Sequence, residues 1–325
     1  MISNHFFTEQ GLDDAHADGR FSGNHHQMLA KECTVPDVHD DLSRDTDQIS
    51  NRQAGQITET QRDTPSILGI WRVGKAIYGS NQCSIHLGQP ADAINSPRWD
   101  YAIKTFPNCS DSWQIKRHVA QVAAISERVT HPNLIATLDA SATAATPYLV
   151  MPRLHATSMH QQLQSGETKP LPVALWMTRQ IAEALESVHQ AGWIHGNVTP
   201  HHIMLGANGH AMLINLGCAQ KMHTVSSNLD AVDRLFASPE SLAGDLAAMG
   251  AMDIYSLGKV LWKWLTATQP ASKTMLESVA TLVESMLASD PHERPSISSV
   301  VMQLKQLEFS VLGKHIGPQG SLKVA

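Results

Sequence analysis

Residues 191–203 read Ala-Gly-Trp-Ile-His-Gly-Asn-Val-Thr-Pro-His-His-Ile, and this stretch decides how the rest of the chain is interpreted. The apolar residues before it recur three or four apart and are Ala174, Met177, Ile181, Leu185 and Val188. This spacing predicts a helix with one buried face. After it, residues 203–205 and 212–214 are apolar and flank Asn208-Gly209, which predicts a small hairpin. The stretch is therefore expected to be a polar loop between a helix and a hairpin.

Short apolar clusters that are typical of strands precede this region. They are separated by Gly, Asn and Pro and lie at residues 70–77, 85–87, 99–106, 134–138 and 148–151. Between Trp113 and Arg128 the apolar residues are spaced as in a helix. Further helices are predicted at residues 254–265, 275–287 and 297–307, and the first of these is apolar on nearly every side, so it should be buried. The fold class is therefore α+β, with a small antiparallel sheet followed by a larger helical region.

The first 65 residues differ in composition from the rest of the chain. Residues 1–63 hold 12 of the 30 acidic residues but only 5 of the 24 basic ones. They show no sustained apolar period, so we expect residues 1–65 to form a disordered acidic segment. The folded domain is expected at residues 66–309, followed by a tail at 310–325.

The remaining body is almost neutral, so its composition offers no argument for a nucleic-acid partner or an anionic membrane surface. No apolar run reaches the roughly 18 residues that a membrane helix needs. The four cysteines, at positions 33, 83, 109 and 218, show no C-x-x-C pairing. This pattern is typical of a reducing compartment, and we expect a cytoplasmic protein without nucleic-acid or membrane partners.

Several further motifs follow one another around the polar loop. They are Tyr-Ala-Ile-Lys at 101–104, His-Pro-Asn at 131–133, Tyr-Leu-Val-Met at 148–151, Asn-Leu-Gly at 215–217, Ser-Pro-Glu at 238–240, Asp-Ile-Tyr-Ser-Leu-Gly at 253–258 and Arg-Pro at 294–295. In this order and at these intervals the chain resembles the protein kinase family, in particular bacterial Ser/Thr kinases of the eukaryotic type. The resemblance implies a bilobal fold, with an N-lobe of sheet and one helix at 66–152 and a helical C-lobe at 153–309.

The resemblance also implies which positions carry phosphoryl transfer, and this chain departs from the family at each of them. The proton-accepting Asp is Asn197, whose amide cannot take up a proton near neutral pH. The two Mg²⁺ ligands are Asn215, which lacks the formal charge, and His202, whose imidazole suits zinc or copper better. The lysine that steadies the phosphate is Thr199, and the arginine before the base is Gly196. We expect no intact catalytic residue at these positions.

The expected nucleotide site is degenerate as well. Tyr78, Ser80 and Cys83 fall on the three glycine positions of the phosphate-covering loop, where side chains block close backbone approach. The carboxylate that pairs with Lys104 in the family would fall near Gln121 or Val122, and neither is acidic. If a nucleotide binds, it is expected to contact Lys104, Ile85, Ala102, Met151, Leu154 and Met204. Core packing without a ligand would demand the same apolar residue types.

Four residues resemble the family's structural positions. Asp253 is expected to tie the polar loop to the buried helix, and Glu240 to pair with Arg294. His195 is expected to stack in the core. The neighbouring histidines suggest a transition-metal site, but Cys218 is the one thiol close in sequence, and we expect no metal to be bound.

We therefore interpret the chain as a pseudokinase, a kinase-like domain that acts as a binding or regulatory scaffold for protein partners such as an active kinase or another signalling protein. One alternative is an unconventional ATP-dependent Ser/Thr kinase that uses displaced carboxylates such as Glu127 or Asp230. The other is a nucleotide sensor that binds ATP without Mg²⁺. The sequence by itself assigns no cofactor, and ATP without Mg²⁺ belongs to the sensor alternative.

Overall fold

The computed structural model describes residues 67–79, 83–93, 95–106, 113–225, 233–244, 247–269 and 273–316, without the side chains of 273–275 and 311–316. All of these residues belong to one compact unit of the chain, Thr34–Ala325. The acidic segment expected at residues 1–65 lies outside the described residues, so that expectation stays a prediction.

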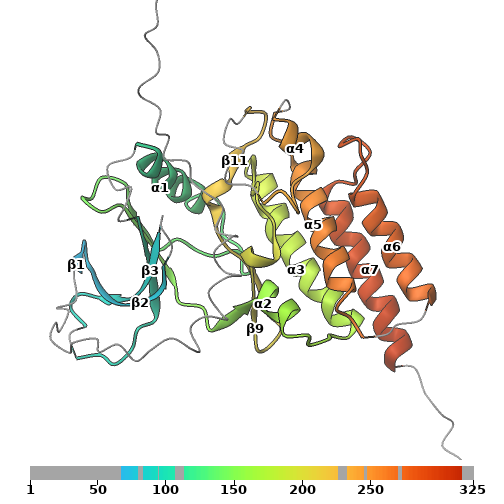
Figure 1. Ribbon diagram of the computed structural model, residues 1–325, viewed down its shortest axis with the longest axis horizontal. Coiled ribbons are helices and arrows are strands. Elements are labelled where there is room, and N and C mark those ends of the chain that lie inside the picture. Colours follow the sequence, from blue (N-terminus) through green and yellow to red (C-terminus); the bar gives the residue numbers. More distant parts are fainter. Residues whose placement is uncertain are drawn as a thin grey trace, which may run out of the picture. The chain divides into compact units, whose positions relative to one another are not determined.

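An antiparallel sheet of six strands forms the N-terminal part of the described chain (Figure 1). Its strands are β1 (Ile67–Leu68), β2 (Trp71–Gly79), β3 (Ser84–Pro90), β4 (Tyr101–Thr105), β5 (Asp139–Ser141) and β6 (Tyr148–Pro152). In space their order is β1-β2-β3-β4-β6-β5, and each neighbouring pair is antiparallel. The predicted antiparallel sheet is thereby confirmed.

One predicted strand was wrong in position. Residues 134–138 form no strand in the described structure, and β5 begins at Asp139 instead. The Ile135 N–H donates to the Leu213 carbonyl at 2.9 Å, and the Leu213 N–H donates to the Asn133 carbonyl at 2.8 Å. Backbone groups at the start of this segment therefore bond to the hairpin of the helical part, so they do not continue the ladder of the large sheet.

Helix α1 (Trp113–Ser126) is the helix predicted for the N-terminal part. Its buried residues are Ile115, Val119, Val122 and Ile125, whose spacing predicted it. They join Phe106 and Leu149 of the sheet region in one hydrophobic core. The sheet and the helix are thus held together by apolar burial.

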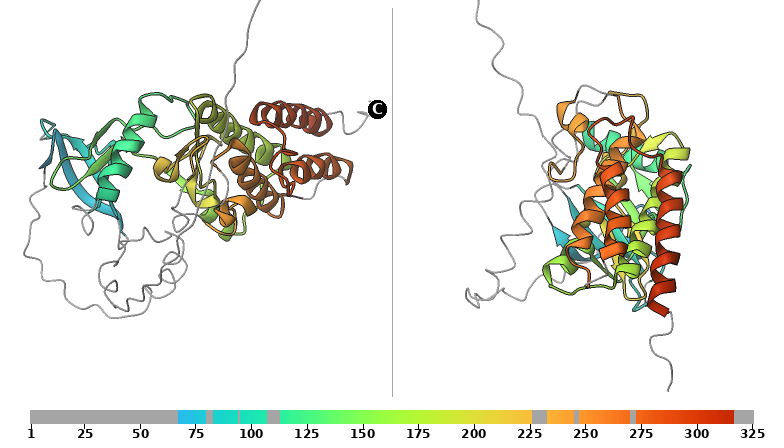
Figure 2. Two further views of the ribbon diagram at one scale, coloured as in Figure 1. Left: turned by 90° about the horizontal axis from the view of Figure 1, so that it is seen from above. Right: turned by 90° about the vertical axis from the view of Figure 1, so that its right-hand side faces the viewer.

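Helices dominate the C-terminal part. They are α2 (Met159–Gln164), α3 (Leu171–Gln190), α4 (Pro239–Ala243), α5 (Gly250–Leu265), α6 (Lys273–Met286) and α7 (Ile297–Ile316). Figures 1 and 2 show α3, α5, α6 and α7 side by side, and contacts join α3 to α7 and α5 to α6. The predicted long helices and the α+β class are confirmed. Helix α7 continues beyond residue 309, where the folded domain was expected to end.

Two small sheets frame the polar loop. Strands β9 (Ile203–Gly206) and β10 (Ala211–Leu213) form the predicted hairpin, and β7 (Ala156–Ser158) adds a third strand beside β9. The hairpin turns at Gly209, whose φ of 79° favours glycine. Strands β8 (Trp193–Ile194) and β11 (Gln220–Lys221) pair with each other, so the chain before the loop and the chain after Asn215 lie side by side.

Helix α5 is buried on most of its circumference. Ile254, Leu257 and Leu261 are among its buried side chains, but Trp262 is 55 % exposed. The expectation that this helix is covered on nearly every side was therefore wrong along one stripe. Although α5 is apolar, none of the helices in the described ranges is long and apolar enough to cross a membrane.

Candidate functional site

Asp253 of α5 anchors the polar loop between β8 and β9. It is 1 % exposed, and its two oxygens accept the backbone N–H groups of His195 at 2.7 Å and Gly196 at 2.8 Å. His189, in the last turn of α3, donates from Nε2 to the same carboxylate at 2.9 Å. Burial by itself raises the pKa of the Asp253 carboxyl, but the hydrogen bond and charge of His189 bring it below its ordinary value. The anchor is therefore ionised. Sequence reasoning singled out Asp253 and missed His189.

His195 links the loop to the strand that precedes Asn215. Its ring is completely buried, and Nε2 lies 2.9 Å from the Ile214 carbonyl oxygen. Because a carbonyl can only accept, Nε2 carries the proton, while Nδ1 accepts the Asn197 N–H at 3.3 Å. Burial lowers the pKa of His195, which keeps this ring neutral.

Two residues in the left-handed backbone region shape the loop. Gly196 has φ of 76°, and a Cβ built on it would lie 2.6 Å from the Cys218 carbonyl oxygen. A side chain at this position would push the segment after Asn215 away. Asn215 itself has φ of 67° and ψ of 64°, a conformation that Asn and Asp adopt more readily than other side chains.

The side chains at the two expected metal-ligand positions bond to each other. Asn215 Nδ2 lies 2.9 Å from His202 Nε2, and His202 Nδ1 lies 2.9 Å from the backbone carbonyl oxygen of Asn197. The carbonyl requires the proton on Nδ1, so the neutral ring accepts from the Asn215 amide through Nε2. Thr199 Oγ1 lies 3.4 Å from Nδ1 and is fully buried. Positions 197, 199, 202 and 215 thus form one hydrogen-bonded network, to which Asn197 contributes its backbone carbonyl.

The Asn197 side chain extends this network to the segment that follows Asn215. Asn197 is 3 % exposed; its Nδ2 donates to Cys218 Sγ at 3.7 Å, and its Oδ1 accepts the Asp233 N–H at 3.4 Å. The amide therefore connects two points of the chain on either side of residues 226–232. A carboxylate could accept from Asp233 but could not donate to the sulfur.

The side chains at the two metal-ligand positions do not fit a magnesium–nucleotide complex of the kind that the kinase resemblance implies. Mg²⁺ favours carboxylate oxygens in octahedral geometry. Asn215 and His202 instead present an amide nitrogen and an imidazole that are engaged with each other. We therefore derive no step through a metal at this position.

The three histidines of the loop do not converge on one point. His201 stacks on His160 of α2 with ring centroids 3.7 Å apart, whereas the centroids of His195 and His202 are 6.3 Å apart. Among the described residues, no three His, Cys, Asp or Glu side chains gather as a metal site would require.

The positive charge of Lys104 acts on His118 of α1, one helical turn before the positions where the family's carboxylate would fall. Sequence reasoning placed that carboxylate near Gln121 or Val122, neither of which is acidic. Val122 is buried in the core, and Gln121 donates from Nε2 to the Ala219 carbonyl oxygen. That neither position supplies a carboxylate to Lys104 follows from their residue types, and the side chain of α1 on which the charge of Lys104 acts is His118. Lys104 Nζ also lies 5.5 Å from the Phe106 ring centroid.

His118 is held in a tight apolar setting. Its ring meets Phe106 edge to face at 5.5 Å, and a Cβ added to Gly217 would overlap it. Burial, and then the positive charge of Lys104, lower the pKa of His118 to about 3. The lysine therefore faces a neutral imidazole here. The histidine gave no signal in the sequence, because only the packing of α1 selects it.

The residues expected around a nucleotide come from four strands and one connection. Ala102 of β4 pairs with Met151 of β6, and Ile85 of β3 pairs with Lys104. Met204 lies on β9, opposite Ser158 of β7. Leu154 lies in the connection after β6, and its role, like that of the others, stays a prediction.

The phosphate-covering loop is only partly described. Cys83 is 6 % exposed and packs in the main core with Phe106, and Tyr78 lies half-buried against the same core. Ser80 lies outside the described residues. At two of the three expected glycine positions a side chain thus packs inward.

The end of the segment after Asn215 is held by an ion pair with two hydrogen bonds. Arg294 donates to the two Glu240 oxygens at 2.5 and 3.0 Å, and it also donates to the carbonyls of Ala251 and Ala288, each at 2.9 Å. Burial raises the pKa of the Glu240 carboxyl, but the hydrogen bonds from Arg294 outweigh it and leave the pKa below its usual value. This pair ties α4 to the chain between α6 and α7.

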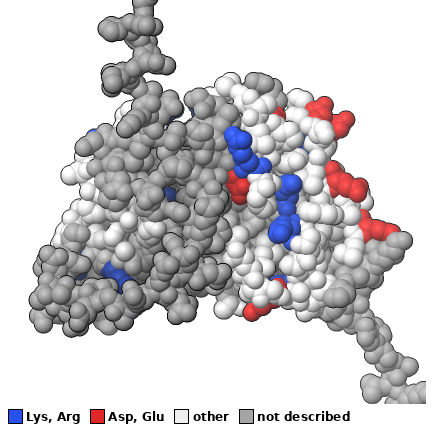
Figure 3. Space-filling model, in the orientation of Figure 1, with Lys and Arg blue, Asp and Glu red and all other residues white. Residues whose placement is uncertain are grey.

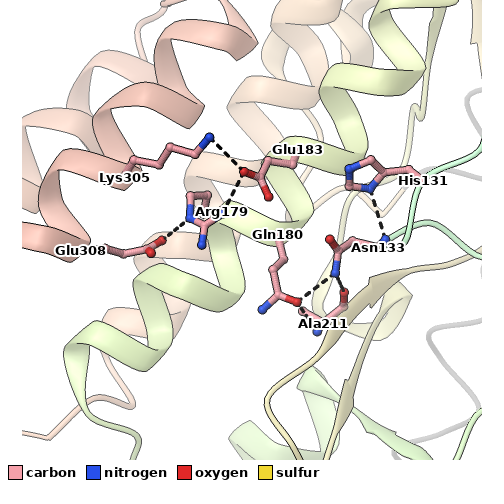
Figure 4. A network of polar contacts seen from close by, with 8 residues as sticks. All are labelled: His131, Asn133, Arg179, Gln180, Glu183, Ala211, Lys305 and Glu308. Carbon is pink, nitrogen blue, oxygen red and sulfur yellow. Dashed lines mark hydrogen bonds and ion pairs between the residues drawn. The ribbon is translucent and has the colours of Figure 1, made fainter. Parts of the chain in front are cut away.

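A second polar network, shown in Figure 4, connects the chain after α1 to the helical part. Asn133 Nδ2 donates to Gln180 Oε1 at 2.9 Å and to the Ala211 carbonyl at 2.7 Å, and the Ala211 N–H donates to Gln180 Oε1 at 3.0 Å. Both side chains are buried. Sequence reasoning noted Asn133 within a motif and missed Gln180, which the helical period alone does not distinguish.

Ion pairs beside this network join α3 to α7 (Figure 4). Arg179 bonds Glu308 at 2.7 Å and Glu183 at 2.8 Å, and Lys305 bonds Glu183 at 3.3 Å. They fix the last helix against the helix that leads into the polar loop.

One carboxylate lies next to Asn197 that sequence reasoning did not name. Asp233 is 7 % exposed, its N–H bonds Asn197, and its Oδ1 accepts the Leu235 N–H at 2.9 Å. Of the two displaced carboxylates that were named, Glu127 is exposed just after α1, and Asp230 lies outside the described residues.

Comparison with known proteins agrees with the architecture. The protein kinase domain family matches residues 91–306. Serine/threonine-protein kinase PkaA of Streptomyces coelicolor is 24 % identical over 265 residues, which cover 73 % of this chain and 47 % of PkaA. Serine/threonine-protein kinase PrkC of Bacillus subtilis is 26 % identical over 219 residues, 66 % of this chain and 33 % of PrkC. The chain thus spans less than half the length of these curated relatives.

Proposed function

Since this chain belongs to the protein kinase family, we propose that it keeps the family's architecture, lacks magnesium-dependent phosphoryl transfer, and acts as a cytoplasmic scaffold that binds protein partners in signalling. One observation carries the proposal. The side chains at the two metal positions, His202 and Asn215, are hydrogen-bonded to each other, and the His202 ring also bonds the backbone carbonyl of Asn197 at the base position.

The chemistry of these groups supports the proposal. An amide at the base position cannot accept the substrate's proton, and a general base is typically worth about 10² to 10⁴ in rate. Lys104 faces a neutral imidazole where the family has a carboxylate. The polar anchors Asp253 and Glu240 keep the surrounding backbone in place, which a binding domain needs as much as an enzyme does.

Phosphate transfer from labelled ATP tests the proposal. Purified protein is incubated with Mg²⁺ or Mn²⁺ and a general Ser/Thr substrate, beside a Lys104→Met variant. We expect the same background signal from both proteins. Transfer by the parent that disappears in Lys104→Met would overturn the proposal.

A second function, an unconventional Ser/Thr kinase, is favoured by the buried Asp233 beside Asn197. In this reading the Asp233 carboxylate receives the proton of the substrate hydroxyl. It predicts transfer that survives Asn197→Ala and is lost in Asp233→Asn. A silent parent protein excludes this function and agrees with the scaffold.

A further inference from the structure

Helix α5 exposes a large apolar side chain on a basic stripe. Trp262 is 55 % exposed, whereas Leu257, Leu261 and Trp264 of the same helix are at most 3 % exposed. Lys263 is exposed next to it, and Lys259 is half-buried three residues earlier, on the same face of the helix. Tryptophan is enriched among the residues that contribute most binding energy at the centre of protein interfaces.

Helix α6 carries the opposite charge on its exposed surface. Glu277 and Glu284 are exposed and seven residues apart, so they lie on one face, and Leu276 beside them is 37 % exposed. In the orientation of Figure 1, Figure 3 shows Lys and Arg over the middle of the helical part, with some Asp and Glu beside them, and further Asp and Glu along its right-hand margin. Both signs of charge therefore lie on one side of the molecule.

The contact between α5 and α6 shows how far along the two helix axes Trp262, Glu277 and Glu284 lie. A Cβ on Gly258 would lie 3.0 Å from both Leu287 Cδ2 and Met286 Cβ. Figure 1 shows α5 and α6 side by side and running in opposite directions. Four residues further along α5, Trp262 comes level with about residue 282 of α6, because each residue advances a helix by about 1.5 Å. The tryptophan thus stands between the levels of Glu277 and Glu284.

From this pattern we propose that the α5–α6 face, made of Lys259, Trp262, Lys263, Leu276, Glu277 and Glu284, binds a second copy of this chain. A two-fold axis brings the lysine stripe of each copy opposite the glutamate stripe of the other, with Trp262 and Leu276 at the centre. Opposite charges then meet at two equivalent places, whereas a partner of one charge sign would leave one stripe unmatched. Self-association through this face does not depend on whether the nucleotide site transfers phosphate.

Sedimentation velocity of the full chain tests this interface, from about 1 to about 100 μM, a range that brackets micromolar dissociation constants. We expect the wild-type chain to pass from monomer to dimer. Lys263→Glu alone and Glu284→Lys alone should each weaken association by about tenfold or more, since like charges then meet twice. An equimolar mixture of the two variants should dimerise again, because the reversed charges face each other at one contact and the native pair remains at the other.

Two further variants make the result specific. Trp262→Gln removes the apolar centre without changing a charge and is expected to abolish the dimer. Lys116→Glu, an equal charge reversal on the exposed side of α1, should dimerise like wild type. Circular dichroism and thermal melting establish that each variant is folded. A wild-type chain that stays monomeric over the whole range, or a mixture that associates no better than the single variants, would refute the proposal.

Discussion

Asn197→Asp restores the family's carboxylate, and we expect it to destabilise this protein. In the structure the Asn197 amide donates to Cys218 Sγ and accepts the Asp233 N–H. The substitution replaces the donor by a second oxygen that faces the sulfur. If the position merely lacked a catalytic group, the change would be harmless to folding.

The cost at neutral pH follows from burial. Losing the amide donor removes at most about 1 kcal/mol, because sulfur is a weak acceptor. The larger part is the charge itself, placed at a site where the side chain is 3 % exposed and close to Asp233. Leaving such a charge without a cationic partner brings the loss in the free energy of unfolding to about 3 kcal/mol. A loss of this size lowers the melting temperature by roughly 6 to 12 °C for a domain of this length.

The pH dependence distinguishes a buried charge from a packing defect. The charge accounts for about 2 of these 3 kcal/mol, which corresponds to a folded-state pKa near 5.4 for the new carboxyl, against about 3.9 in the unfolded chain. Because the folded-state pKa is the higher one, this part of the variant's stability is lost as pH rises from about 4 to about 5.4. The total penalty should be about three-quarters as large at pH 5 as at pH 7.5.

Urea unfolding at pH 5 and pH 7.5, followed by circular dichroism, measures both quantities. Asn208→Asp is the matched control, since Asn208 is exposed and its Oδ1 accepts the His210 N–H, as a carboxylate also can. We expect the control to unfold like wild type at both pH values. An Asn197→Asp protein as stable as wild type at pH 7.5, or destabilised equally at both, would refute the reasoning.

Three other outcomes are expected. Gly196→Ala should lower the free energy of unfolding by about 2 kcal/mol or more, because it adds left-handed strain to a clash with the Cys218 carbonyl, and thermal melting measures it. Glu240→Gln should lower the free energy of unfolding by about 3 to 5 kcal/mol at pH 7, because the Arg294 guanidinium loses its carboxylate. The folded protein lowers the pKa of Glu240 below its ordinary value of 4.5, so wild type loses this stability as pH falls below 4.5. The difference between wild type and variant in urea unfolding should therefore become smaller at low pH. Any thermal stabilisation by millimolar ATP should be equal in EDTA and in Mg²⁺, and a larger shift with Mg²⁺ would contradict the proposal that the magnesium ligands are lost.

The sequence alone determined the framework and the order of the motifs. The apolar periods in α1 and α3 predicted which residues of those helices are buried, because a helix that lies on a core must turn one face toward it. The α+β arrangement followed from these periods and from the strand-like clusters before them. The sequence also showed that positions 197 and 215 lack the carboxylates of the kinase family, because whether a side chain can ionise depends on its residue type.

The tertiary structure decided which side chains meet. The sequence showed that no acidic residue stands near Gln121 to pair with Lys104, but only the packing of α1 on its apolar core placed His118 where the charge of Lys104 acts on it. The strand expected from residue 134 begins only at Asp139 for a related reason, because the backbone of Asn133 and Ile135 bonds to Leu213 of a distant hairpin. Likewise, the bonds of Asn197 to Cys218 and Asp233 join positions far apart along the chain. Periodicity reports which face of one element is buried, whereas contacts between elements depend on how those faces pack, and only the folded chain specifies that.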